Sequence, residues 1–121
     1  MKKILLVDDD YDVLAVLEQR LSKAGYGVIK ASSGQEAMEK LKIQIPDLIL
    51  LDLILPDMDG GAIAQKIRQD PSTENIPIIF LTCLFTKDDE KAEGHLMGNN
   101  FFVAKPYQHN ELLKIIQEHI K

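Results

Sequence analysis

The chain has 121 residues, which suits one domain spanning 1–121, and its 45% hydrophobic and 27% charged residues are typical of a folded globular protein. The net charge of −5 argues against direct binding to nucleic acid, and no apolar stretch reaches the roughly 20 residues of a membrane span. Lys2 and Lys3 precede an apolar run that is too short for a signal peptide, so we expect a cytoplasmic protein with no membrane partner. The single cysteine excludes an internal disulfide, which fits a reducing compartment.

Short apolar runs alternate along the chain with segments of helical spacing. The runs are rich in Ile, Leu and Val and lie at 4–7, 28–29, 48–51, 78–81 and 101–104. Because these runs are continuous and do not alternate with polar residues, they predict strands that are covered on both faces of a sheet.

Helix signals separate the runs in chain order. The first helix has an apolar stripe of Val13, Leu14, Leu17 and Leu21, and Gly25 follows it as a C-cap. Ser33 and Glu36 have the spacing of a capping box at the start of the second helix, which Pro46 stops. The later helices are predicted at about 61–69, at about 87–97, and around the stripe of Leu112, Leu113, Ile116 and Ile120.

Five alternations of strand and helix predict an α/β fold with a doubly wound, open parallel sheet. An eight-unit barrel would need about twice this length. Ligands on open parallel sheets bind outside the carboxyl ends of the strands, at the point where the strand order reverses.

Polar side chains follow four of the five predicted strands. Asp8 and Asp9 follow the first strand, Asp52 the third, Thr82 the fourth and Lys105 the fifth. Because the carboxyl ends of parallel strands meet at one edge, these side chains are expected to gather in one cleft.

Three carboxylates in one cleft repel each other, by about 4 kcal/mol for two unit charges 4 Å apart at an effective dielectric of 20. Either some carboxyl groups are protonated or a cation holds them. Oxygen ligands without a His or Cys cluster suit Mg²⁺, or Mn²⁺ as an alternative. A lysine and a threonine facing such a cation suit a phosphoryl group.

The stretches "LLVDDD", "LLDLILPDMDG", "FLTC" and "FFVAKP" occur in this order between residues 5 and 106, so the resemblance that they carry extends over essentially the whole chain. They resemble the receiver domain of two-component response regulators. The resemblance implies a five-stranded (βα)5 flavodoxin-like fold with strand order 2-1-3-4-5. It also implies a switch that takes a phosphoryl group from a histidine kinase or phosphotransfer protein, and that signals to a downstream protein target or fused output domain.

The resemblance also implies roles for individual residues of the acid set. Asp52 matches the aspartate that accepts the phosphoryl group. Asp9 matches the direct ligand of Mg²⁺, together with Asp52, and Asp8 matches the acid that acts through water. The backbone carbonyl of Ile54 completes the metal ligands.

Three further residues match the phosphoryl-contacting and switch positions. Lys105 and Thr82 match the lysine and the hydroxyl that contact the phosphoryl group, and Phe102, with Thr82, matches the switch pair. Phe102 stands where many relatives carry tyrosine. Cys83 is larger than the usual residue after the switch hydroxyl, and Asn99 stands where alanine is usual.

Structural interpretations compete with some of these roles. Asp10 is expected to cap the next helix, and Asp57 and Asp59 to serve as turn and cap residues. Thr82 alone would usually be a strand residue, Lys105 alone a surface lysine, and Phe102 is as readily a core residue as a switch.

Three other functions compete with this hypothesis. A haloacid-dehalogenase-type phosphohydrolase would carry a second aspartate at the position of Ile54, and a flavodoxin-like flavin carrier would need a phosphate-binding loop where Asp8 and Asp9 stand. A degenerate receiver that only binds partners would not keep the complete acid set. We therefore expect a signalling switch whose only chemistry is self-catalysed phosphotransfer and dephosphorylation.

Overall fold

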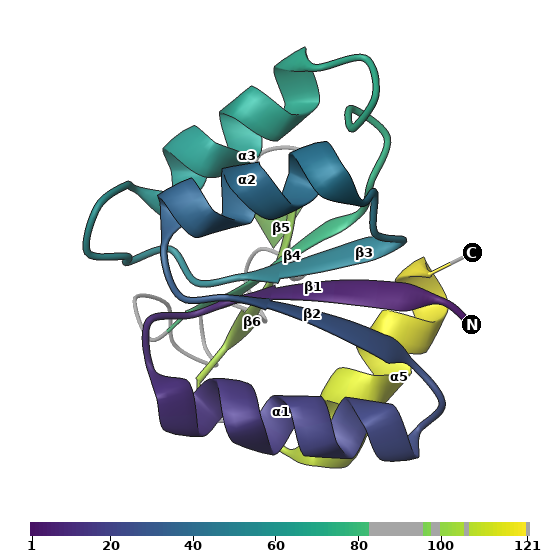
Figure 1. Cartoon of the computed structure of the whole chain (residues 1–121). Helices are drawn as coiled ribbons and strands as arrows, with labels where there is room; N and C mark the ends of the chain where they lie inside the picture. Colours follow the sequence, from purple (N-terminus) through teal and green to yellow (C-terminus); the bar gives the residue numbers. More distant parts are fainter. Residues whose placement is uncertain (83–95, 98–99, 106, 121) are drawn as a thin grey trace.

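The structure is a computed structural model, and it describes residues 1–82, 96–97, 100–105 and 107–120 (Figure 1). Within these ranges the elements are β1 (Lys3–Val7), α1 (Tyr11–Lys23), β2 (Gly27–Ala31), α2 (Gly34–Ile43), β3 (Leu48–Leu51), α3 (Gly60–Gln69), β4 (Ile78–Thr82), β5 (Leu96–Met97), β6 (Asn100–Ala104) and α5 (His109–His119). None of the helices in the described part of the chain is long and apolar enough to cross a membrane.

The strands form one sheet in the order β2-β1-β3-β4-β6-β5. The pairs from β2 to β6 are all parallel, with Val7 opposite Leu51 and Thr82 opposite Ala104. The predicted α/β class and the predicted order of five parallel strands are therefore confirmed, with β6 as the fifth of them.

The sheet has one strand that the sequence did not predict. Leu96 and Met97 form β5 and pair antiparallel with Phe101 and Asn100 of β6. Residues 87–95 of the predicted fourth helix lie outside the described part of the chain. The expectation that this helix continues to Met97 is wrong, because the backbone there pairs with the edge of the sheet.

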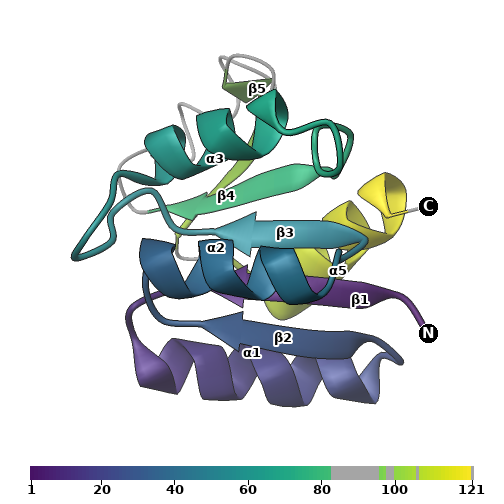
Figure 2. The ribbon, with the colours of Figure 1, turned by 45° about the horizontal axis from the view of Figure 1, so that its top comes forward.

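Helices cover both faces of the sheet (Figures 1 and 2). Helices α2 and α3 lie on one face, and α1 and α5 lie on the other. Each face has its own buried apolar cluster, with Ile63 and Phe80 in the first and Leu21 and Ile116 in the second. The central strands β1 and β3 contribute to both clusters, which explains their continuous apolar runs.

The helix ends follow the predicted signals with one difference. Asp10 caps α1, Gly25 takes the left-handed conformation (φ 98°) after α1, and the Ser33 side chain accepts the amide of Glu36. The Glu36 carboxylate accepts the amide of Ser32 at 2.7 Å, although the capping-box pattern predicts a bond to Ser33. The start of α2 is thus closed one residue further upstream than expected.

Candidate functional site

Two of the predicted acids continue the hydrogen-bond ladder of the sheet beyond the ends of their strands. The amide of Asp8 donates to the carbonyl of Ala31 at 3.1 Å, and the amide of Asp52 donates to the carbonyl of Val7 at 3.0 Å. Both residues are therefore fixed at the carboxyl ends of neighbouring strands, where the sequence predicted them.

Asp8, Asp9 and Asp52 form an acid cluster, as we call these three residues from here on. Each offers one carboxylate oxygen, and these oxygens lie within 4.8 Å of one another. Asp8 is buried, Asp52 is partly buried and Asp9 is exposed, so the cluster opens towards solvent on one side. Three clustered carboxylate oxygens are the ligand type that Mg²⁺ and Mn²⁺ prefer, and the residues present fit such an ion.

Lys105 follows β6 and reaches across to the acid cluster. Its Nζ lies 3.1 Å from Oδ2 of Asp8 and 3.6 Å from Oδ2 of Asp52. Burial by itself would lower the pKa of Lys105, but the charges of Asp8 and Asp52 outweigh it and raise the pKa above the ordinary value. Lys105 is therefore an ammonium ion that partly neutralises the cluster, and not the solvated surface lysine of the competing interpretation.

The carboxyl group of Asp52 has a raised pKa. Burial is the main cause, and the charges of Asp8 and Asp9 add to it. The amide of Ile54, which donates to Oδ1 of Asp52 at 3.2 Å, and the charge of Lys105 oppose the shift without cancelling it. A cation bound beside Asp52 would favour its ionised form.

The loop between β3 and α3, residues 52–59, is closed on itself. Ile54 and Asp59 form an isolated antiparallel bridge, and the amide of Gly60 donates to the carbonyl of Leu53 at 2.8 Å. A Cβ atom on Gly60 would overlap the carbonyl oxygen of Asp52, so this close approach requires glycine. The backbone around Ile54 is therefore held next to Asp52.

Three further acids near the site accept backbone amides. Two of them cap helices, as predicted, and the third makes contacts that were not predicted. Asp10 accepts the amides of Asp12 and Val13 at the start of α1, and Asp59 accepts the amide of Gly61 at the start of α3. Asp57, expected to be a turn residue, lies in a bend of the loop and in addition accepts two amides of α2. No sequence signal indicates this contact, because its partners lie more than 20 residues away.

The model of the response regulator receiver domain matches residues 4–117 of the chain. The chain belongs to this family.

The curated relatives of this receiver domain include regulators of transcription. It is 39% identical to the alkaline phosphatase synthesis transcriptional regulatory protein PhoP of Bacillus subtilis over 113 residues, which are 92% of this chain and 45% of PhoP. It is 39% identical to the probable transcriptional regulator ycf27 of Guillardia theta over 111 residues, which are 92% of this chain and 42% of that protein. The chain thus spans less than half the length of these curated relatives.

Solved structures share the fold over nearly the whole chain. The chemotaxis protein CheY4 of Vibrio cholerae superimposes with a TM-score of 0.84 at 30% identity, and the match covers 99% of both chains. A putative response regulator from Chloroflexus aurantiacus has a TM-score of 0.82 at 34% identity and covers 97% of this chain and 95% of its own. These matches support a receiver domain over the phosphohydrolase and flavin-carrier alternatives.

The two residues predicted to form the switch pair, Thr82 and Phe102, are only partly described. Thr82 ends β4 opposite Ala104, the residue before Lys105, which places its backbone at the same edge as the acid cluster. Nothing is described of its side chain, and Cys83 and Asn99 lie outside the described ranges. Phe102 has no exposed surface and lies in the core cluster of α2 and α3. This burial matches the core interpretation, and the switch role stays a prediction.

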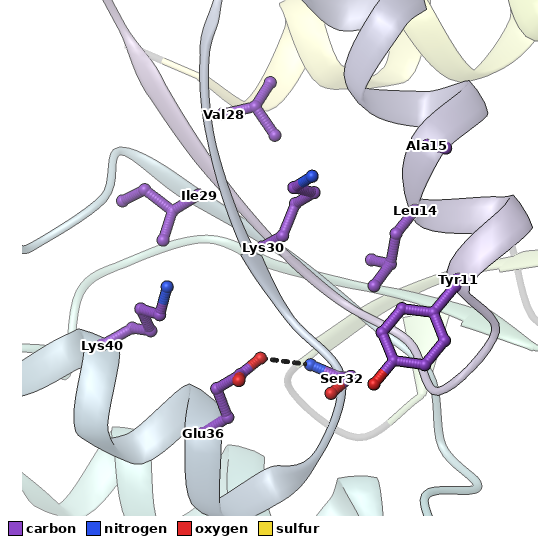
Figure 3. A pocket seen from close by; sticks show the side chains of 9 residues that line it. All are labelled: Tyr11, Leu14, Ala15, Val28, Ile29, Lys30, Ser32, Glu36 and Lys40. Atoms are coloured by element: carbon purple, nitrogen blue, oxygen red, sulfur yellow. Dashed lines mark hydrogen bonds between the residues drawn. The ribbon is translucent and has the colours of Figure 1, made fainter.

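Two hollows lie near the site without containing the acid cluster. The first has a volume of about 470 Å³ and lies where side chains of α1, β2 and α2 meet. Figure 3 shows these side chains, with the hydrogen bond that the amide of Ser32 donates to Glu36 among them. The second, of about 590 Å³, runs along α1 to Lys105, Tyr107 and His109. Burial raises the pKa of the Tyr107 hydroxyl beside Lys105. Sequence reasoning identified neither surface, because both form only when distant segments pack.

Proposed function

We propose that Asp52 accepts a phosphoryl group from a phosphohistidine of a histidine kinase or phosphotransfer protein, in a reaction that requires Mg²⁺. The observation that carries this proposal is the meeting of the acid cluster and Lys105 at one edge of the sheet. Phosphoryl acceptance is general for the receiver family, and the match to residues 4–117 supports it here.

The acid cluster supplies the ligands for the metal. Asp9 and Asp52 would bind Mg²⁺ or Mn²⁺ directly, Asp8 through water, and the backbone carbonyl of Ile54 would complete the set. When bound, the ion would neutralise charge on the phosphoryl oxygens. The distances within the cluster suit this role, since its oxygens already lie within 4.8 Å of one another.

The chain's own residues carry the transfer. An oxygen of Asp52 forms a bond to phosphorus as the bond between phosphorus and the imidazole nitrogen breaks, and the electron pair stays on the histidine. Lys105, which already lies 3.6 Å from Asp52, contacts a phosphoryl oxygen of the product. The hydroxyl of Thr82 donates to another. Water later hydrolyses the acyl phosphate, so both steps are reactions of the domain itself and not turnover of a separate substrate.

Thr82 and Phe102 couple this chemistry to the surface. The new group brings up to two negative charges and three acceptor oxygens, and Thr82 moves towards it to donate a hydrogen bond. Because Phe102 is already fully buried, its response is a repacking within the core and not an entry from solvent. The changed surface would include β6 and α5, which we propose contact a downstream protein target or a fused output domain.

The proposal is tested by phosphorylation with acetyl phosphate in the presence and absence of Mg²⁺. Intact mass should rise by one phosphoryl group in wild type only when Mg²⁺ is present, and Asp52→Asn should show no gain. Ser72→Ala, a change far from the acid cluster, is a control that should be labelled like wild type. Equal labelling of Asp52→Asn would show that another residue is the acceptor.

A further inference from the structure

The β3–α3 loop is attached to helix α2 by a carboxylate that the proposed chemistry does not use. The two oxygens of Asp57 accept the amide of Gly34 at 2.9 Å and the amide of Gln35 at 3.0 Å. These are the first two residues of α2, whose amides have no partner inside the helix. The same two bonds hold the pKa of Asp57 below its ordinary value, so the group stays ionised at neutral pH.

Packing reinforces the same attachment. Met58, the next residue of the loop, packs against Gly34. A Cβ atom added to Gly34 would come within 2.7 Å of the sulfur of Met58. It would also come within 2.9 Å of Cδ1 of Ile63 in α3. Gly34 itself is buried. The tip of the loop therefore meets the first turn of α2 through both hydrogen bonds and close contact.

The other end of the loop carries the metal ligands of the proposed function. Asp52 begins it, and Ile54 is tied to Asp59 by the bridge that closes it. A loop fixed at its tip does not have to be ordered when an ion binds, whereas a free loop would lose conformational entropy at that moment. Residues that orient metal ligands without touching the metal commonly affect affinity strongly.

We propose that Asp57 is a positioning residue of the metal site, which holds the β3–α3 loop on α2 so that the carbonyl of Ile54 is set for the ion. This role rests on the proposed function, because it presupposes that the acid cluster binds Mg²⁺. It goes beyond that function by assigning a part to α2, which supplies no ligand.

The test is a Mg²⁺ titration of the whole chain followed by amide NMR shifts, which report both folding and affinity. Asp57→Ala should stay folded and bind Mg²⁺ about tenfold more weakly than wild type, the lower end of the effect known for residues that orient metal ligands. Asp57→Asn, which keeps one acceptor oxygen, should lose less. The difference between these two variants isolates the hydrogen bond, since both remove the same charge.

Two control variants separate this role from general stability. Ser33→Ala removes the hydroxyl that accepts the amide of Glu36 at the same helix end. Asp70→Ala removes an exposed carboxylate that accepts the amide of Ser72 in a turn beyond α3. Both should bind Mg²⁺ within about twofold of wild type, because sites that share no contacts with the metal ligands couple to them only weakly.

The outcomes distinguish the metal site from the role of Asp57. The positioning role alone would be overturned if wild type binds Mg²⁺ tightly, Asp9→Ala abolishes this binding, and Asp57→Ala leaves it unchanged. Equal weakening by Asp57→Asn and Asp57→Ala would overturn it too, because charge would then explain the loss. No binding in wild type would overturn the metal site and this role together.

Discussion

Replacing Lys105 by methionine tests whether this lysine acts as the resident counterion of the acid cluster. In wild type its ammonium lies 3.1 Å from Asp8 and 3.6 Å from Asp52. At an effective dielectric of 20, each of these contacts is an attraction of about 5 kcal/mol. By the same estimate, two ionised acids of the cluster 4.8 Å apart repel by about 3.5 kcal/mol.

Most of this Coulomb attraction does not add to the free energy of unfolding, because desolvation of the charges offsets it. The Lys105 side chain is 24% exposed, and bringing it beside the buried Asp8 costs desolvation. The expected loss on removal lies between the 3–5 kcal/mol of a fully buried pair and the 0–1 kcal/mol of a surface pair, at about 2 kcal/mol. The matched control is Lys30→Met, because Lys30 and Glu18 form a pair of similar length, 3.0 Å, with side chains 45% and 40% exposed.

Urea unfolding followed by circular dichroism at neutral pH measures both variants without Mg²⁺ and at saturating Mg²⁺. Lys105→Met should lose about 2 kcal/mol in the metal-free protein, and Lys30→Met at most about 1 kcal/mol. Because the Lys105 ammonium and a cation would both be attracted by the carboxylates of Asp8 and Asp52, Lys105→Met should bind Mg²⁺ more tightly and recover part of its loss when saturated. Metal-free stability equal to wild type, or weaker Mg²⁺ binding, would refute the counterion argument.

Two further predictions concern Asp52 and the switch pair. The pKa of Asp52 is raised in the folded state, so its ionisation opposes folding, and this penalty grows as pH rises from the ordinary value of 3.8 through the folded pKa. Asp52→Asn should therefore melt at a higher temperature than metal-free wild type at neutral pH, and this difference in melting temperature should vanish below pH 3.8. A difference that stays the same at low pH would show that packing, and not ionisation, causes it. Thr82→Ala should still bind beryllofluoride but show smaller amide shifts at Phe102 and along α5 than wild type, and full-sized shifts would exclude coupling through Thr82.

The residues at the strand ends could be predicted because the physics of a parallel sheet is simple. A buried run such as Leu48–Leu51 must be a strand, and the polar residue that follows it must leave the core at the carboxyl edge. Asp8, Asp52 and Lys105 obey this rule, so one sheet brings together residues almost 100 positions apart. The caps at Asp10, Ser33 and Asp59 could be predicted equally well, because each of these side chains accepts an amide no more than three residues further along the chain.

Other contacts could not be predicted, because they depend on how separate segments pack. The bonds from Asp57 to α2 exist only once the loop and the helix lie together. The strand β5 has two residues, too few for any periodicity, and its pairing with β6 depends on a sheet edge that must already exist. For Phe102, an apolar run predicts burial but does not say which neighbours the ring would displace when it moves.

The way that Asp8 and Asp52 extend the sheet has a consequence for local opening of the molecule. The amide of Asp8 bonds to Ala31 of the edge strand β2, whereas the amide of Asp52 bonds to Val7 between the neighbouring inner strands β1 and β3. Exposing the Asp52 amide to water therefore requires separating strands in the centre of the sheet. Segments of this kind exchange their amide hydrogens only through unfolding close to global, whereas short surface loops open at much lower cost. The amide of Asp52 should thus be among the last to exchange, and that of Asp8 should exchange sooner, because an edge strand can separate without opening the centre of the sheet. Motion that accompanies signalling is then expected to leave the position of Asp52 unchanged.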